Sequence, residues 1–208
     1  MDTVNTEARL SWFRGFVQGK TRITFAWIFA ILLGFSAREY PTWPGIVLCL
    51  VGATLRFWAS GYLRKDTRPA VGGPYSFVRN PLYLGTYLMA LGTALAIENW
   101  PLLAAATVLF AIIYHFIILD EETKLQRLFQ GAYRDYCENV PRFFPRFWPP
   151  FFPASREALS RINPEQNHHQ FSYSLAMKNK ACEAYLSFLG LIGGVGLVAF
   201  LWKHWVMS

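Results

Sequence analysis

WPLLAAATVLFAIIYHFIIL, which runs from Trp100 to Leu119, is the stretch of the chain that decides its fold. Its 20 residues include no Asp, Glu, Lys or Arg, and the run ends at Asp120. A helix needs about 20 mostly apolar residues to cross the hydrocarbon core of a bilayer. The sequence therefore predicts that this stretch is a transmembrane helix.

Four further apolar runs surround this one. They extend over Ile23–Ala37, Trp43–Leu63, Leu82–Ile97 and Ala184–Val206. The chain of 208 residues is 53% hydrophobic and only 16% charged, whereas about 25% of the residues in a soluble domain are charged. Trp and Tyr gather near the ends of the runs, as they do at membrane interfaces. We therefore expect an all-α integral membrane protein with about five transmembrane helices.

The basic residues orient this bundle. The N-terminal tail holds four of the 20 Lys and Arg residues, the loop between the second and third runs holds four, and the segment from Lys124 to Lys180 holds nine. With five spans, these segments lie on one side of the membrane. Because cytoplasmic loops are enriched in Lys and Arg, we expect that side to be cytoplasmic. The net charge of +7 then indicates topology and contact with anionic membrane lipids, and it does not indicate nucleic-acid binding.

On this topology the chain divides into four parts. They are a cytoplasmic tail with an interfacial helix (1–22), a four-helix transmembrane core (23–119), a cytoplasmic segment with a helix over Glu121–Asn139 (120–183) and a C-terminal transmembrane helix (184–208). A polar tail precedes the first apolar run and no small-residue cleavage site follows it. We therefore expect a retained anchor in a bacterial inner membrane, with the N-terminus and the active site cytoplasmic. The sequence indicates no particular oligomeric state.

The first long cytoplasmic loop, RKDTRPAVGGPYSFVRN at residues 64–80, holds a turn and leads into a helix. GGPY at residues 72–75 is typical of a turn, because glycine permits positive φ and proline restricts the next bend. Asn80 and Pro81 are typical of a helix N-terminus, with Asn80 as the N-cap and Pro81 in the first turn. Free N–H groups at a helix N-terminus attract anions. The loop therefore brings Arg79 to a predicted anion site.

The second cytoplasmic segment starts directly after Leu119 and is predicted to be an amphipathic helix that ends at VP (140–141). Its apolar residues recur every three or four positions. They are Leu125, Leu128, Phe129, Ala132, Tyr133 and Tyr136. Glu121 and Glu122 lie on or beside this apolar face, so we expect at least one of the two carboxylates to contact a bound cofactor.

Together the two segments hold the groups that a sulfonium methyl donor needs. The carboxylate of S-adenosylmethionine suits Arg79 and the helix start, and its ammonium and ribose hydroxyls suit Glu121 or Glu122. Its sulfonium suits an aromatic face such as Tyr75 or Tyr83, through cation–π attraction. The two segments therefore predict a site at the cytoplasmic face, with Arg79 and Glu121 among its catalytic residues, and S-adenosylmethionine as its ligand rests on a family resemblance.

The histidines suggest one further catalytic residue and no metal site. His115 lies inside the Trp100–Leu119 run, near the level of the predicted site, and ionisable residues within a span are functional by default. We expect His115 to act as a base on the acceptor side or to orient the acceptor. His168 and His169 are adjacent in a polar linker without a third ligand at metal-binding spacing, so no metal site is expected.

Two runs, in this order, resemble a known family. They are GGPYSFVRNPLYLG (72–85) and EETKLQRLFQGAYRDYCENVPRFFP (121–145). They are similar to the isoprenylcysteine carboxyl methyltransferases and their bacterial and phospholipid-methylating relatives, with R-[HN]-P-x-Y before one span and E-E-x-x-L after the next. The similarity covers about Leu63–Pro145. It implies a membrane enzyme that methylates a lipophilic small molecule or a lipidated acceptor with S-adenosylmethionine, without the soluble methyltransferase fold.

The resemblance also implies which residues hold the cofactor. Together with the residues chosen above, the predicted cofactor-binding set is Thr67, Arg68, Pro69, Ala70, Gly73, Tyr75, Asn80, Pro81, Tyr83, Glu121 and Glu122. Three positions depart from the prenylcysteine enzymes: Asn80 replaces a His, Gln130 replaces a Gly, and Ile117 replaces an Arg that faces the substrate carboxylate. The last departure argues against a prenylated cysteine carboxylate. A lipid amine, a prenyl or alkyl carboxylate, a thiol and a small lipophilic metabolite stay open as acceptors.

Two other functions compete with methyl transfer. Membrane reductases similar to the sterol reductases use NADPH, and this chain has no glycine-rich dinucleotide fingerprint. A non-catalytic lipid-binding membrane protein needs only the fold. The combination of Arg79, Asn80, Tyr83 and Glu121 argues against that second alternative, because a lipid-binding protein has no use for it.

Overall fold

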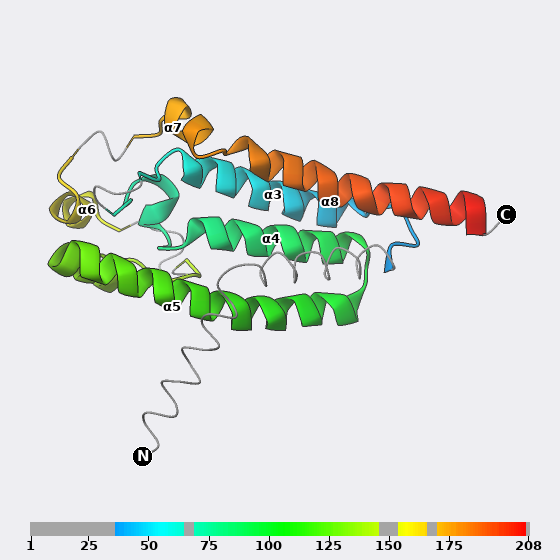
Figure 1. Ribbon diagram of the computed structural model, residues 1–208, viewed down its shortest axis with the longest axis horizontal. Helices are drawn as coiled ribbons and strands as arrows, with labels where there is room; N and C mark the ends of the chain where they lie inside the picture. Colours follow the sequence, from blue (N-terminus) through cyan, green and yellow to red (C-terminus); the bar gives the residue numbers. More distant parts are fainter. Residues whose placement is uncertain (1–35, 65–68, 146–153, 166–169, 207–208) are drawn as a thin grey trace, which may run out of the picture.

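The computed structural model describes residues 36–64, 69–145, 154–165 and 170–206, and these ranges form helices and loops without a strand. Four long helices run side by side (Figure 1). They are α3 (Trp43–Ser60), α4 (Pro81–Ala96), α5 (Trp100–Asn139) and α8 (Cys182–Leu201), and a π-helical turn, η3 (Trp202–Val206), extends α8. Figure 1 places α6 (Arg156–Ile162) and α7 (Tyr173–Lys178) at one end of the bundle, with the loop 61–80. We call this the loop end.

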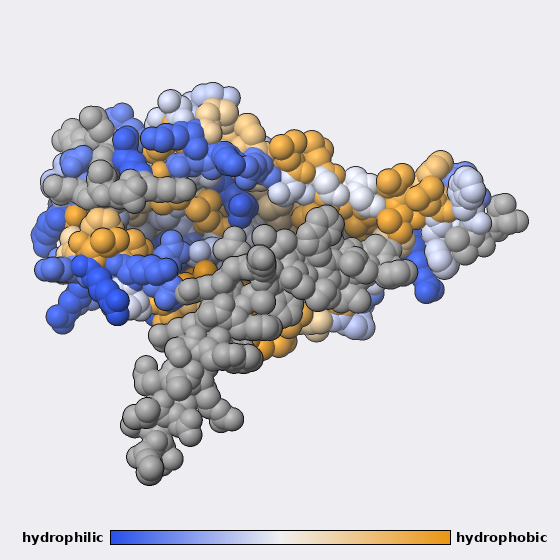
Figure 2. All heavy atoms as spheres, viewed as in Figure 1, coloured by the Kyte–Doolittle hydropathy of each residue, from blue (hydrophilic) through white to orange (hydrophobic). Residues whose placement is uncertain are grey.

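These helices confirm an all-α integral membrane protein. Helix α3, helix α5 and the stretch Cys182–Trp205 are long and apolar enough to cross a membrane, and α4 is a shorter apolar helix of 16 residues. On the face seen in Figure 2, hydrophilic residues gather at the loop end and hydrophobic surface continues along α8. The predicted span Ile23–Ala37 lies, apart from its last two residues, outside the described part of the chain.

Helices α3 and α4 pack backbone against backbone, because glycines face each other between them. A Cβ atom on Gly52 would lie 2.6 Å from the carbonyl oxygen of Gly85, and one on Gly92 would lie 2.8 Å from the Cα atom of Cys49. Small residues permit this close approach of two membrane helices. The α3–α4 pair therefore holds both ends of the loop 61–80 at a set distance from each other.

Helix α5 differs from the prediction of a separate span and amphipathic helix. Trp100–Leu119 and the first part of Glu121–Asn139 form one continuous helix, and α5 as a whole consists of two helical stretches that meet at a kink at Gln130 (φ 41°, ψ −116°). No Gly or Pro stands near residue 120 to end the helix there. Helix α5 therefore continues past the apolar run and carries Glu121 and Glu122 to the loop end.

The loop end has a small hydrophobic core of its own. It is formed by Val71, Tyr133, Tyr136, Val140, Leu159 and Ile162, all of which are buried. These residues come from the loop 61–80, the last part of α5 and α6. Because the three segments share one core, the loop is held in place by tertiary packing.

Candidate active site

A cavity of about 370 Å³ lies at the loop end, a volume within the range of about 300–1,000 Å³ that is usual for small-molecule sites. Its lining residues are Leu63, Arg64, Pro69, Ala70, Tyr75, Arg79, Asn80, Pro81, Leu82, Tyr83, Glu121, Leu125, Leu128, Phe129, Tyr133 and Tyr136. They come from the loop 61–80, the first turn of α4 and the later part of α5. The two segments singled out in the sequence therefore meet around one cavity.

The loop reaches the cavity through a short 3-10 helix, η1 (Gly73–Ser76). Gly73 begins it at φ +55°, in the left-handed region that glycine adopts without strain. The hydroxyl of Tyr136 on α5 donates a hydrogen bond to the carbonyl oxygen of Tyr75 (2.7 Å). The backbone N–H of Arg79 donates to the carbonyl oxygen of Pro141 (2.9 Å). These two bonds join the loop to the end of α5.

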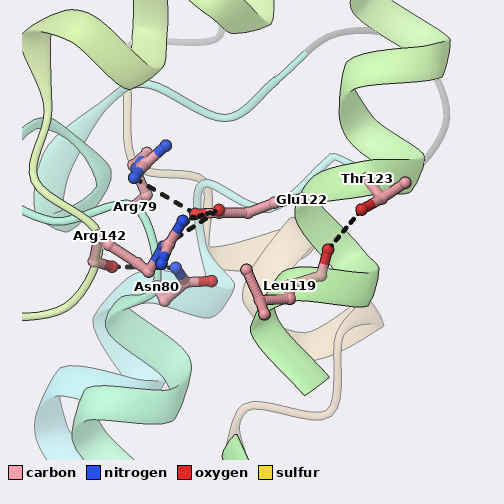
Figure 3. Close-up of polar contacts among 6 residues, drawn as sticks. All are labelled: Arg79, Asn80, Leu119, Glu122, Thr123 and Arg142. Atoms are coloured by element: carbon pink, nitrogen blue, oxygen red, sulfur yellow. Dashed lines mark hydrogen bonds and ion pairs between the residues drawn. The ribbon is translucent and has the colours of Figure 1, made fainter. Parts of the chain in front are cut away.

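Helix α4 begins at Pro81, as predicted, but the Asn80 side chain does not cap it. Its Nδ2 group instead donates to the backbone carbonyl of Arg142 (2.9 Å) (Figure 3). The predicted N-cap bond is therefore wrong. The amide of Asn80 links the start of α4 to the segment after α5, and the side chain still lines the cavity.

Glu122 is buried between two arginines (Figure 3). Arg79 Nη2 lies 3.4 Å from Glu122 Oε1, and Arg142 Nη2 lies 2.9 Å from Glu122 Oε2. Arg142 Nε also donates to both carboxylate oxygens, at 3.2 and 3.1 Å. A buried carboxylate is tolerated when cations and hydrogen bonds compensate the lost hydration. Glu122 is therefore engaged by the protein itself, and it orients Arg79.

Two buried polar atoms of residues that line the cavity have no hydrogen-bond partner among the described residues: Tyr75 Oη and Arg79 Nε. Burial raises the pKa of Tyr75, and the nearby Glu121 carboxylate and Tyr83 hydroxyl raise it further. The Tyr75 hydroxyl therefore stays protonated at neutral pH and can donate. Leaving such a buried group unsatisfied costs about 1–3 kcal/mol, so both atoms suit a polar ligand.

The cavity lining also includes a carboxylate and aromatic rings. The Tyr83 hydroxyl donates to Glu121 Oε2 (2.8 Å), and Glu121 itself is exposed. The Tyr83 ring meets the edge of Tyr114 (5.2 Å between centroids), which stacks on Phe110 at 3.8 Å. The Tyr83 side chain is thus held at its hydroxyl by Glu121 and at its ring by Tyr114, and it fixes the Glu121 carboxylate at the cavity.

The structure brings most of the predicted site residues together. Those that line the cavity are Pro69, Ala70, Tyr75, Arg79, Asn80, Pro81, Tyr83 and Glu121. Gly73 and Glu122 stand behind the wall as the turn residue and the partner of Arg79. His115 is exposed on α5 against the ring of Phe116, away from the lining, so its role as a base stays a prediction. Thr67 and Arg68 lie outside the described residues.

Sequence reasoning missed several residues of the site. Arg64 and Leu63 line the cavity where α3 ends, and Arg142 completes the Glu122 network. Leu125 and Phe129, from the predicted apolar face of α5, pack against the core of the loop end and also line the cavity. A basic residue directly after the helix-ending VP dipeptide was the available signal for Arg142. No local pattern distinguishes a packing face from a cavity wall.

Most of the residues that line the cavity lie in the part of the chain that matches a known family. The family model described as phospholipid methyltransferase matches residues 50–132, which include α4 and much of α5. The protein-S-isoprenylcysteine O-methyltransferase of Schizosaccharomyces pombe is 33% identical over 81 residues, which are 37% of this chain and 33% of that protein. None of the proteins named in this comparison is a reductase. No solved structure matches the chain significantly.

Two longer matches are to proteins named for metal resistance. The nickel-cobalt-cadmium resistance protein NccN of Alcaligenes xylosoxydans xylosoxydans is 32% identical over 126 residues, 56% of this chain and 58% of that protein. The cobalt-zinc-cadmium resistance protein CzcN of Cupriavidus metallidurans is 31% identical over 135 residues, 61% and 62% of the two chains. The chain thus matches about three fifths of the length of these relatives. The central region of the chain is thus similar to the phospholipid and isoprenylcysteine methyltransferases.

Proposed function

We propose that the chain transfers a methyl group from S-adenosylmethionine to a lipophilic acceptor that reaches the site from the membrane. The observation that carries this proposal is the pair of buried, unsatisfied atoms in two cavity-lining residues, Tyr75 Oη and Arg79 Nε. A ligand with both hydrogen-bond acceptors and a negative charge satisfies them. The carboxylate of the amino-acid moiety of S-adenosylmethionine has that character at Arg79.

The remaining groups of the cavity suit the rest of the cofactor. Glu121 is the carboxylate suited to the ammonium or the ribose hydroxyls, because Glu122 is already engaged by Arg79 and Arg142. The rings of Tyr83, Phe129 and the other aromatic lining residues suit the adenine and the sulfonium. The alternatives Glu121 and Glu122 thus separate into a ligand-facing group and a positioning group.

The methyl transfer needs little covalent participation of the protein. When bound, S-adenosylmethionine supplies an electrophilic methyl group on a sulfonium centre. The cavity residues bind, orient and exclude water, and such positioning accounts for most of the rate in a direct transfer. Glu121 can accept a proton if the acceptor is an amine or a thiol, and a carboxylate acceptor needs no base. We place the loop end at the cytoplasmic face of a bacterial inner membrane, because Lys and Arg concentrate there.

NccN and CzcN are named for resistance to metal ions. Within the described ranges of this chain, no group of three or more His, Cys, Asp or Glu side chains is placed to hold a metal ion. No observation therefore favours metal binding as a second candidate function.

Thermal-shift measurements on the detergent-purified chain test the proposal. We expect S-adenosylhomocysteine to raise the Tm and NADP to leave it unchanged. Stabilisation by NADP alone would replace the proposal with a reductase, and a response to neither ligand would favour a lipid-binding protein without enzymatic activity.

The Tyr75→Phe variant tests the carrying observation. Because its hydroxyl is buried without a partner among the described residues, the substitution removes an unsatisfied group, and we expect the Tm of the unliganded variant to be at least that of the wild type. Loss of one hydrogen bond to the ligand should weaken S-adenosylhomocysteine binding about tenfold by calorimetry. Tyr173→Phe, which changes an exposed tyrosine of α7, is the matched control. Unchanged affinity of Tyr75→Phe would mean that the cofactor lies elsewhere.

A further inference from the structure

The segment after α5 docks on the loop that borders the cavity, although it lies outside the region matched by the family model. The backbone N–H of Ala154 donates to the carbonyl oxygen of Ser76 (2.9 Å). The backbone N–H of Ser172 donates to the carbonyl oxygen of Gly61 (3.1 Å). The described residues 154–165 and 170–181 thus contact this loop near both of its ends.

Asn179 holds the loop where it leaves α3, at Ser60 and Leu63. Its Nδ2 group donates to the carbonyl oxygens of Ser60 (2.9 Å) and Leu63 (2.7 Å). Carbonyl groups at the end of a helix have no partner within the helix, so a side-chain donor there fixes the path of the chain that follows α3. Leu63 and its neighbour Arg64 line the cavity. Asn179 therefore sets where this part of the wall lies.

Asn163 holds the loop at its second contact, the carbonyl group of Pro69. It is fully buried beside the core of the loop end, with an exposed fraction of 0%. Its Nδ2 group donates to the carbonyl oxygen of Pro69 (3.2 Å), and its Oδ1 atom accepts from the backbone N–H of Glu165 (3.2 Å). A buried amide is costly unless it is satisfied, so this bond specifies one position for Pro69 and Ala70. Both of these residues line the cavity.

We propose that Asn163 and Asn179 are positioning residues of the methyl-donor site. Neither side chain lines the cavity, but each holds by its amide one of two stretches of the same wall, residues 63–64 and 69–70. Ligand affinity depends on pre-organised walls, since ordering them on binding costs free energy. The C-terminal segment therefore sets the affinity of a site whose lining it does not enter. This inference rests on the proposed function.

The test compares Asn163→Ala, Asn179→Ala and a matched control, Asn139→Ala. Asn139 also donates to a backbone carbonyl, that of Asp135 (2.8 Å), but at an exposed position of α5 away from the wall. Calorimetry on the full chain in detergent gives the Kd of S-adenosylhomocysteine, and hydrogen exchange follows the amides of residues 61–64 and 70–72. We expect about tenfold weaker binding for each wall variant, faster exchange limited to those amides, and wild-type values for the control.

The outcomes separate the two proposals. A wall variant that loses Tm but binds S-adenosylhomocysteine with wild-type Kd would make the asparagines merely structural and overturn the inference, while the proposed function stands. A wild-type chain that binds no S-adenosylhomocysteine would overturn the proposed function and the inference with it. If Asn163→Ala does not fold, Asn179→Ala decides, because Asn179 is only partly buried.

Discussion

Replacing Glu122 by Gln removes the charge that holds two arginines at the start of α4 and the end of α5. The variant keeps the size and the acceptor oxygen of the side chain. It leaves the guanidinium groups of Arg79 and Arg142 facing each other without an anion between them. We expect the variant to lower both the stability of the loop end and the affinity of the cavity, because Arg79 is the residue that lines it.

The magnitude follows from burial. The side chains of Glu122 and Arg79 are 6% and 10% exposed, whereas that of Arg142 is 43% exposed. Removing one partner of a buried ion pair costs about 3–5 kcal/mol, and the retained amide places Glu122→Gln at the lower end, about 3 kcal/mol. For a chain of 150–250 residues, that corresponds to a Tm lower by roughly 6–12 °C. Arg142→Gln should cost less, because water screens that arginine and Glu122 keeps Arg79.

Thermal unfolding of the detergent-purified variants measures this order. Glu138→Gln is the control on the same helix, since the 3.5 Å ion pair of Glu138 with Arg134 is exposed and should contribute at most about 1 kcal/mol. Loss of Tm should decrease from Glu122→Gln through Arg142→Gln to Glu138→Gln. If Glu122→Gln and Glu138→Gln unfold at the same temperature, the Glu122 network does not hold the loop end together.

Three further variants test other parts of the structure. Gln130→Gly should raise the Tm by about 2–4 °C, because Gly relieves the positive φ of this position, whereas Gln126→Gly in regular helix should lower it by a similar amount. Gly52→Ala should destabilise the chain by roughly 1–3 kcal/mol, because the new Cβ atom would meet the backbone of α4. Gly190→Ala is the control, because a Cβ atom there meets open space, and equal Tm values for the two variants would contradict the close α3–α4 packing. Glu121→Gln should weaken S-adenosylhomocysteine binding about tenfold by calorimetry and leave the unliganded Tm unchanged, since Glu121 is exposed; wild-type affinity would remove it from the site.

Much of the cavity could be predicted from sequence because its groups follow local signals. Pro81 starts α4 as expected, and VP (140–141) ends α5 as expected. The order of the two motifs was sufficient to place Tyr83 and Glu121 in one site, where they share a hydrogen bond. The side-chain bond of Asn80 could not be predicted, since its acceptor is the carbonyl of Arg142, 62 residues away.

The helix does not break between the predicted span and the predicted cytoplasmic helix, and the reason is physical. Hydropathy changes sharply at Asp120, but a change of solvent does not end a helix. Residues such as Gly or Pro end a helix, and neither stands near Asp120. The departure falls instead at Gln130, where the backbone is non-helical although the residue is not a glycine. The resemblance places a Gly at this position in the prenylcysteine enzymes, and that difference is a sign of the kink in the sequence.

Hydropathy and charge along the chain were sufficient to predict a bundle of apolar helices with a charged face, and to place the two motif segments at that face. Hydropathy and charge act residue by residue, so they can be summed along the chain without knowing the fold. Only the tertiary structure decided which of two adjacent carboxylates faces the cavity. Glu122 points to Arg79 and Arg142, and Glu121 bonds to Tyr83, because successive residues on a helix point in different directions. The asparagine contacts to the wall likewise depend on packing between segments 94 and 116 residues apart.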